Sequence, residues 1–186
     1  MTSVDPTLQD PIPAWVDGRL VPAAKLEVHR SGLRHKAVSV FVVVGDELLI
    51  QRRALGKYHT PGLWANTCCT HPRWGEAATE CARRRLDEEL GLVGLPLTWR
   101  DRIEYRAEVG DGMVEHEVVD LFLSMPANRP EPLPDPAEVM ETAWIPLDEL
   151  CALIARHPRR FTPWLRIYLR DHKPRIFGAA SGRGAP

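Results

Sequence analysis

The chain lacks the cysteine spacing that marks structural zinc sites and disulfide-bonded folds. It contains four cysteines, Cys68, Cys69, Cys81 and Cys151, and no two of them form a Cys-x-x-Cys pair. Adjacent cysteines do not normally bridge each other, so Cys68 and Cys69 are not a disulfide candidate. We therefore expect reduced thiols, which are the usual state in the cytoplasm.

Long apolar runs are also missing. No stretch approaches the roughly 20 consecutive apolar residues that a transmembrane helix requires. Residues 1–13 are polar and rich in proline, without the basic start and apolar run of a secretory signal peptide. The sequence therefore predicts a cytoplasmic protein without a membrane partner.

Neither sign of charge is in excess. The 186 residues include 24 lysines and arginines against 25 aspartates and glutamates, which gives a formal net charge of −1. This balance argues against nucleic acid as a partner, and any bound anion must be held by a local group of basic residues or by a metal. The hydrophobic fraction of 44% is ordinary for a globular protein, and the chain is long enough to bury a core.

Hydrophobic periodicity predicts one mixed β-sheet with helices packed on it, an α/β fold of the α+β kind. The recurring apolar face of residues 76–90, followed by Gly91, predicts the clearest helix. We expect a flexible segment at 1–13, a single domain at 14–176 and a disordered tail at 177–186. The predicted strands cover residues 15–20, 37–44, 48–53, 103–108, 114–125 and 143–145, and further helices cover residues 146–156 and begin at Thr162.

Two short segments concentrate groups that suit proton transfer and cation binding. Residues 66–72, Asn-Thr-Cys-Cys-Thr-His-Pro, place thiols and an imidazole just before the charged helix. Further on, Glu115 and Glu117 lie two residues apart in a predicted strand, so both carboxylates point to one side of the sheet. Like charges on one face repel each other, so such a pair either faces a cation or lies on a solvated edge strand.

The charged helix carries a distinctive spacing of acidic and basic residues. Residues 76–92 contain Glu-x7-Arg followed by Glu-Glu-x-Gly-Leu, which resembles a Nudix box. Glu88 and Glu89 offer the hard oxygen ligands that suit Mg²⁺, and Mg²⁺ in turn binds diphosphate. Two positions depart from the box: Thr70 stands where the box has its leading glycine, and Arg85 where it has the glutamate of its Arg-Glu pair. The missing acid argues against hydrolysis.

Five separated motifs occur in a characteristic order along the chain. They are Gly-Leu-Arg-His-Lys-Ala-Val-Ser-Val-Phe at 32–41, Gln-Arg-Arg-Ala-Leu-Gly-Lys at 51–57, Pro-Gly-Leu-Trp-Ala-Asn-Thr-Cys-Cys-Thr-His-Pro at 61–72, Glu-His-Glu at 115–117 and Phe-Thr-Pro-Trp at 161–164. Together they resemble the type I isopentenyl-diphosphate isomerases, over residues 15–168. The resemblance implies a Nudix-like mixed sheet flanked by helices. It also implies an enzyme of isoprenoid biosynthesis that interconverts two small molecules, isopentenyl and dimethylallyl diphosphate, and we expect a monomer.

The resemblance assigns proton transfer to Cys69 and Glu117. The substrate double bond is unactivated, so one group must protonate its terminal carbon, which leaves a tertiary carbocation. Another group must remove a proton from the neighbouring methylene. A thiol and a carboxylate on opposite faces of the substrate satisfy both needs, provided that each lies within reach of its carbon.

The resemblance also implies two metal sites. One site of three imidazoles and two carboxylates suits Mn²⁺, Zn²⁺ or Mg²⁺, and a cation there would tune the proton affinity of Glu117. The other places Mg²⁺ on Glu89, against the diphosphate. The ligands implied for the first site are His29, His35, His71, Glu115 and Glu117.

Fixed groups are implied for both ends of the substrate. Several cations match a multiply charged anion, and a ring face stabilises a carbocation by roughly 0.5–2 kcal/mol while shielding it from water. The implied diphosphate-binding cations are Lys25, Arg53, Lys57 and Arg85, and the implied aromatic neighbours of the reacting carbons are Tyr105 and Trp164.

Several of these side chains have an ordinary structural alternative. Cys69 taken alone would be an inert buried thiol, and Trp164 would be a core residue. A packing role is expected for Cys68, whose side chain should point away from that of Cys69, and for Cys81 and Cys151, which lie in apolar helical positions.

Histidines outside the motifs are expected to face solvent, namely His59, His157 and His172, and His116 is expected at the surface or behind the ligands.

Two other functions remain open. A Nudix hydrolase is favoured by the general box and opposed by Arg85 and by the thiol loop. A non-enzymatic metal-binding or regulatory domain would leave the thiol and the carboxylate pair without a role.

Overall fold

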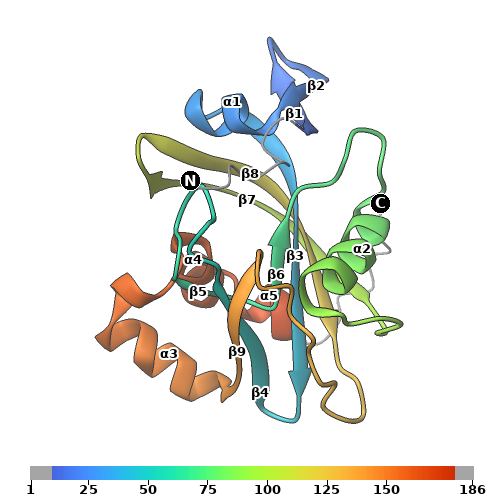
Figure 1. Cartoon of the computed structure of the whole chain (residues 1–186), viewed down its shortest axis with the longest axis vertical. Coiled ribbons are helices and arrows are strands. Elements are labelled where there is room, and N and C mark those ends of the chain that lie inside the picture. The colour runs from blue at the N-terminus through green and yellow to red at the C-terminus, as the bar shows by residue number, and fades with distance from the viewer. Residues whose placement is uncertain (1–9, 179–186) are drawn as a thin grey trace.

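The computed structural model describes residues 10–178. A mixed β-sheet lies between helices on its two faces, and the hairpin of β1 and β2 extends from one end of it (Figure 1). The strands are β1 (Pro11–Val16), β2 (Arg19–Ala24), β3 (Arg34–Val44), β4 (Glu47–Arg53), β5 (Trp64–Ala65), β6 (Cys68–Thr70), β7 (Thr98–Gly110), β8 (Met113–Ser124) and β9 (Val139–Pro146). The helices are α1 (Lys25–Arg30), α2 (Ala78–Leu90), α3 (Leu147–Arg156), α4 (Pro163–Asp171) and α5 (Lys173–Phe177), with the 3₁₀ helix η2 (Pro158–Arg160) before α4.

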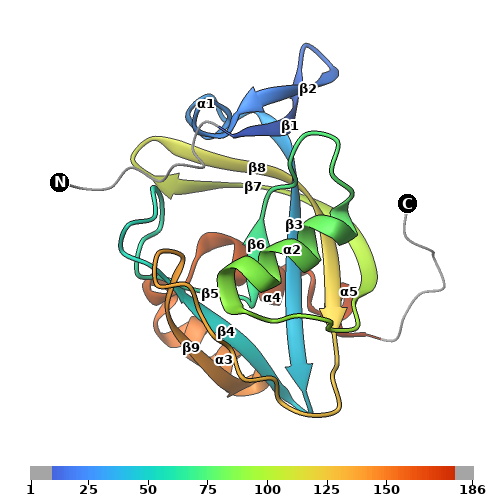
Figure 2. The same cartoon turned by 45° about the vertical axis from the view of Figure 1, so that its right-hand side comes forward.

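Strand β3 is buried along most of its length because helices cover the sheet on both faces. Figure 2 shows α2 crossing in front of β3, with α4 and α5 on the far side. The side chains of β3 alternate between two apolar clusters, as the two-residue period of a strand requires. The cluster shared with α2 contains Val38, Val40 and Val42, and the cluster shared with α4 contains Ala37, Phe41 and Val43.

Two pairings of β3 bring distant motifs together. Strand β3 runs parallel to β8 with His35 opposite Glu117, and antiparallel to β6 with Ser39 opposite Cys69. His35 and Ser39 are four residues apart, so their side chains lie on the same face of the sheet, the α4 face. The histidine motif, the thiol loop and the acidic strand therefore meet on that face, near the beginning of β3.

Most predicted elements have a counterpart, with shifted ends. Helix α2 begins at Ala78 rather than Glu76, because the Glu76 carboxylate accepts the backbone N–H of Arg73 and belongs to the preceding turn. The helix ends as predicted at Gly91, whose φ of 63° lies in the left-handed region and whose N–H bonds the Asp87 carbonyl at 2.7 Å.

The N-terminal prediction is wrong in two respects. Residues 15–20 do not form one strand, because Asp17 and Gly18 have φ values of 48° and 76° and turn the chain between β1 and β2. Of the segment expected to be flexible, Pro11 to Pro13 pair with β2, and residues 1–9 lie outside the described residues. The expected tail includes Phe177, which ends α5, while 179–186 lie outside the described part.

Helices α1 and α5 were not predicted from the sequence. They are six and five residues long, which is too short to display a helical period. Within residues 10–178, none of the helices has the length and apolar character that a membrane span needs.

Candidate functional site

Ten of the thirteen predicted site residues surround one cavity of about 30 Å³. They are Lys25, Arg53, Lys57, Cys69, His71, Arg85, Glu89, Glu115, Glu117 and Trp164. The other three, His29, His35 and Tyr105, contact the two carboxylates of β8. A groove of about 320 Å³ adjoins the cavity, since the two share Lys25, Thr70, His71, Arg85 and Glu138 as lining residues.

Three predicted imidazoles converge on the carboxylates of β8. His29 Nδ1 lies 2.6 Å from the carbonyl oxygen of Lys25, and His35 Nδ1 lies 2.7 Å from that of Leu33. A carbonyl only accepts, so both Nδ1 atoms carry the hydrogen and both Nε2 atoms face inward. These Nε2 atoms lie 3.1 and 3.2 Å from Glu115 Oε2.

This arrangement calls for a positive charge between the rings and the carboxylate. When the imidazoles are neutral, the inward Nε2 atoms of His29 and His35 each present a lone pair to an oxygen that also presents lone pairs. Such contacts at about 3 Å repel unless a proton or a metal cation lies between the atoms. Fixing the outer Nδ1–H on a carbonyl is also how proteins hold a histidine as a metal ligand.

The geometry of the cluster fits a divalent cation. Ligand atoms of His29, His35, His71 and Glu115 all lie within 4.8 Å of one another. Glu117 Oε1 lies 3.0 Å from His71 Nε2 and 3.8 Å from His35 Nε2, so it extends the same cluster. Neighbouring ligands of an octahedral ion with bonds of about 2.1 Å are about 3 Å apart, which matches the shorter contacts of 3.0–3.2 Å in the cluster. Imidazole and carboxylate groups together are compatible with divalent metal binding.

The charge on Glu115 is strongly favoured. Burial alone would raise the pKa of this carboxyl group, but the imidazoles of His29, His35 and His59 hold it well below its ordinary value. A buried carboxylate with three imidazole partners is the electrostatic pattern of a ligand rather than of a solvated edge strand. The edge-strand alternative for Glu115 and Glu117 is therefore wrong, since both are buried between β3 and β7.

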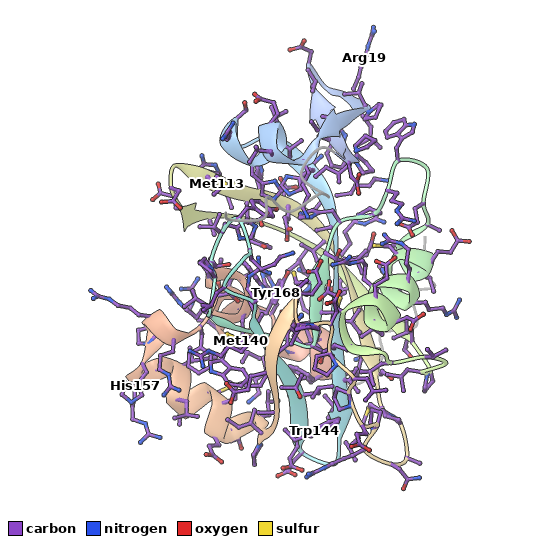
Figure 3. All side chains as sticks on the ribbon, in the orientation of Figure 1. Arg19, Met113, Met140, Trp144, His157 and Tyr168 are labelled. Atoms are coloured by element: carbon purple, nitrogen blue, oxygen red, sulfur yellow. The ribbon has the colours of Figure 1, made fainter. Side chains whose placement is uncertain are left out.

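Cys69 lies on the same face, deeper in the fold. Its sulfur is 3.5 Å from the Ser39 hydroxyl and 3.7 Å from the Tyr168 hydroxyl. Figure 3 shows Tyr168 near the middle of the molecule. Burial, and then the negative charge of Glu117, raise the pKa of the Cys69 thiol well above its ordinary value, so the group holds its proton at neutral pH. Cys69 is thus a protonated thiol at the cavity wall, and not only a packing residue.

Tyr105 is a buried partner of the second carboxylate of β8. Its hydroxyl donates to Glu117 Oε2 at 2.6 Å, while Oε1 of the same group faces His71. Each carboxylate oxygen is therefore held from a different side. The pKa of Tyr105 is raised by burial and by Glu117, so the hydroxyl keeps the hydrogen that this bond requires.

Two of the four predicted cations, Lys57 and Arg85, contact the carboxylates of Glu89 and Glu138. Arg85 contacts Glu89 Oε1 at 2.7 Å and Glu138 Oε2 at 3.3 Å, and Lys57 Nζ contacts Glu138 Oε2 at 2.7 Å. Burial would raise the pKa of Glu138, but Lys57 and Arg85 lower it below its ordinary value. Arg53 lies with its guanidinium 5.3 Å from the Trp164 ring, and within residues 10–178 its buried Nε atom has no hydrogen-bond partner. An unpartnered buried N–H of a cation is a place for an anion to bind.

The helix carboxylates of the Nudix-like box are paired with arginines. Arg84 Nε lies 2.6 Å from Glu76, and its second nitrogen lies 2.9 Å from Glu88. Arg85 lies 3.0 Å from Glu88 and 2.7 Å from Glu89. The two arginines therefore neutralise the helix carboxylates, which in a hydrolase would be the acidic ligands of a metal ion.

Trp164 is both a core residue and a residue of the cavity wall, the two alternatives that the sequence left open. It belongs to the apolar cluster on the α4 face and is 2% exposed, yet it also lines the cavity. Cys68 and Cys81 are buried in the opposite cluster and Cys151 packs partly against the α4 cluster, which confirms the packing role expected for all three.

The prediction for His59 is wrong. Instead of facing solvent, it is 4% exposed and its Nε2 lies 3.0 Å from Glu115 Oε1. Burial lowers the pKa of His59 to about 3 despite this contact, so the ring is neutral. His157 is exposed and projects from the edge of the molecule (Figure 3), His172 is partly exposed, and His116 bonds Glu104 near the surface.

Sequence reasoning also missed Gln51 and Glu138. Gln51 Nε2 donates to Glu89 Oε2 at 3.0 Å, and it lies two residues before Arg53 in β4, so the strand period could have placed it on the same face. Glu138 and His59 lie in irregular segments, where no periodic signal indicates direction. The position of Glu138 depends on the loop that brings it to Arg85 of α2, and the position of His59 on the loop that brings it to Glu115 of β8.

Comparison with known proteins defines the class first. A NUDIX domain model matches residues 33–165. The crystal structure of a Deinococcus radiodurans protein has a TM-score of 0.69 at 16% identity, covering 86% of this chain and 96% of that chain. A MutT Nudix hydrolase from Burkholderia pseudomallei has a TM-score of 0.58 at 22% identity, covering 73% and 95%. These structures share the fold, and the chain is a Nudix protein.

Close relatives define the family within that class. A protein from Cereibacter sphaeroides is 65% identical over 170 residues, which cover 90% of this chain and 94% of its own. A second, from Dinoroseobacter shibae, is 62% identical over 175 residues, with 94% and 99% covered. Both are named isopentenyl-diphosphate Delta-isomerase, and the chain belongs to that family of enzymes.

Proposed function

We propose that this protein interconverts isopentenyl diphosphate and dimethylallyl diphosphate, with Cys69 and Glu117 as the proton-transfer groups. The observation that carries the proposal is that a protonated thiol and a buried carboxylate line the same cavity as four cationic side chains. A substrate with an uncharged five-carbon end and a diphosphate end matches this combination.

The two groups balance a single turnover. A thiol that gives its proton to one carbon, and a carboxylate that takes a proton from another, become a thiolate and a carboxylic acid. That pair of states runs the reverse reaction, and the starting pair is restored for the next forward turnover when the carboxylic acid loses its proton to solvent and the thiolate regains one. Ser39 and Tyr168, which contact the Cys69 sulfur, and Tyr105, which bonds Glu117, hold the two groups in place.

The charges of the cavity support a requirement for metal. Its four cationic side chains, Lys25, Arg53, Lys57 and Arg85, face four carboxylates, Glu89, Glu115, Glu117 and Glu138. These formal charges cancel, so the protein alone offers little net attraction for a diphosphate. A divalent cation on each of two sites would restore a positive field.

We assign Mn²⁺, Zn²⁺ or Mg²⁺ to the cluster of His29, His35, His71, Glu115 and Glu117, and Mg²⁺ to Glu89. The donor sets support these choices, because imidazoles favour transition metals and carboxylates favour Mg²⁺. When bound, these cations would lower the proton affinity of Glu117 and neutralise the diphosphate.

The aromatic residues support protection of a carbocation. Trp164 lines the cavity, where its ring would replace water near the reacting carbons, and Tyr105 is buried beside Glu117. A cation–π contact contributes about 0.5–2 kcal/mol. We further propose that the enzyme acts as a monomer in the cytoplasm, where the free thiol of Cys69 stays reduced.

Deuterium labelling tests the proposal. The protein is incubated with isopentenyl diphosphate, Mg²⁺ and Mn²⁺ in D₂O, and the carbon-bound protons are followed by NMR. Deuterium entering the dimethylallyl product is the expected result, and Cys69→Ala is the matched control that should leave the substrate unlabelled. Released phosphate would support a hydrolase instead, and intact, unlabelled substrate with metal bound would support a binding domain.

A further inference from the structure

We propose that His59 is a positioning residue that holds Glu115 as a one-oxygen ligand of the divalent cation; this inference rests on the metal site of the proposed function. His59 lies in the loop between β4 and β5, outside the group formed by His29, His35, His71 and Glu115. It hydrogen-bonds that group through a Glu115 oxygen, and its ring lies 5.5 Å from the His29 ring between centroids.

The hydrogen bonds of His59 have a defined direction. Its Nε2 lies 3.0 Å from Glu115 Oε1, and its Nδ1 lies 3.1 Å from Thr60 Oγ1. The carboxylate can only accept, so Nε2 carries a hydrogen and donates it to Oε1, while Nδ1 on the other side of the ring is hydrogen-bonded to the Thr60 hydroxyl. The hydrogen-bonded chain therefore runs from Thr60 through His59 to Glu115.

The two oxygens of the Glu115 carboxylate therefore have different partners. Oε1 accepts from His59, while Oε2 faces the inward Nε2 atoms of His29 and His35. A carboxylate with one oxygen bound in this way presents the other as a single ligand atom. Without the His59 N–H, the group is free to rotate and present both oxygens, or neither, to the cation.

The loop around His59 is held in an unfavourable conformation. Thr60 has a φ of 46°, in the left-handed region, where a β-branched residue is rare. Such backbone strain persists only where the surroundings over-determine it, and it concentrates at functional sites. Here the strained residue is the one whose hydroxyl is hydrogen-bonded to the His59 ring.

Two further contacts hold the residue from other sides. Arg53 donates from Nη2 to the carbonyl oxygen of His59 at 3.1 Å, and the His59 ring meets the Trp164 ring edge-on at a centroid distance of 5.8 Å. His59 is therefore joined to a proposed diphosphate-binding cation by its backbone and to a proposed metal ligand by its side chain. His59 is thus fixed by several contacts at once, as expected for a residue that positions Glu115.

Metal affinity of the complete chain tests the inference. His59→Leu removes the donor at similar volume, and His59→Gln keeps an amide N–H. The dissociation constant for Mn²⁺ is measured without substrate, by electron paramagnetic resonance and by competition with a chromophoric chelator. We expect His59→Leu to weaken Mn²⁺ binding by about 10- to 100-fold, the usual effect of losing a partner of a metal ligand, and His59→Gln to recover part of it.

The kinetic readout distinguishes positioning from plain folding. Loss of isomerase activity in His59→Leu should be largely reversed by raising the Mn²⁺ concentration, while the melting temperature of the chelated protein stays close to that of the wild type. The control is His116→Leu, which changes a histidine of β8 that bonds Glu104 away from the cluster. It should bind Mn²⁺ as the wild type does.

Wild-type Mn²⁺ affinity in a folded His59→Leu protein would overturn the inference. If that variant does not fold, Thr60→Val gives the answer, because it removes only the hydroxyl that fixes the ring. A several-fold loss of affinity supports the inference, and an unchanged affinity overturns it. A wild-type protein that binds Mn²⁺ but does not isomerise the substrate would refute the proposed function and leave the role of His59 standing.

Discussion

Removing the hydroxyl of Tyr105 should slow turnover without weakening substrate binding. In Tyr105→Phe the ring stays in the core, and the only loss is the 2.6 Å hydrogen bond to Glu117 Oε2. Both side chains are buried, so water does not replace the missing donor. The variant therefore isolates the support that one carboxylate oxygen receives.

The structure sets the size of the effect. A hydrogen bond to a charged group contributes about 1.5–3 kcal/mol. Each 1.4 kcal/mol corresponds to about a tenfold change in rate, so kcat should fall by about 10- to 100-fold. KM should change little, because Tyr105 contacts none of the diphosphate-binding cations. The unsatisfied oxygen should also destabilise the fold by about 1–3 kcal/mol.

Steady-state kinetics with both metals saturating measure the first effect, and urea unfolding measures the second. Tyr168→Phe is the matched comparison, because its buried hydroxyl bonds the Cys69 sulfur, at 3.7 Å, and the Ser39 hydroxyl rather than a carboxylate. We expect that variant to lose several-fold less activity. A kcat for Tyr105→Phe within twofold of the wild type would refute the role given to this bond.

Other substitutions test the remaining parts of the site. Cys69→Ala and Glu117→Gln should each abolish turnover in a folded protein, measured by the NMR assay, while Cys68→Ala, which changes a buried thiol in the opposite cluster, should retain activity. Arg85→Glu should release no phosphate from diphosphates, because the loss of the cation weakens anion binding first; robust hydrolysis would show the reasoning wrong. Glu138 has a pKa lowered below its ordinary 4.5 by two cations, so its contribution to stability is present above that value and is lost as pH falls through its folded pKa. Glu138→Gln should thus be less stable than the wild type in urea at pH 7, the difference should shrink as pH falls below 4.5, and a difference that stays unchanged in acid would contradict this.

Patterns along the chain were enough to predict much of the sheet and helix α2. The β-branched run of 37–44 and the alternation of 114–125 each correspond to a strand, β3 and β8, because burial on both faces selects such residues. The hairpin of β1 and β2 was missed because its turn residues, Asp17 and Gly18, were read as part of one strand.

The site was predicted best where strands carry it. The prediction that Glu115 and Glu117 share a face follows from the two-residue period, and the parallel pairing with β3 then brings His35 opposite Glu117. His59 was misjudged because its loop has no period, and its direction depends on the left-handed backbone at Thr60. Sequence alone gives no sign of such a conformation at a threonine.

A crystal structure with Mg²⁺, Mn²⁺ and an unreactive analogue of isopentenyl diphosphate would test the central claim most directly. We predict that the Cys69 sulfur and a Glu117 oxygen contact the hydrocarbon from opposite sides, with the phosphates among Arg53, Lys57 and Arg85. An analogue bound with its hydrocarbon away from either of the two proton-transfer groups would contradict this account.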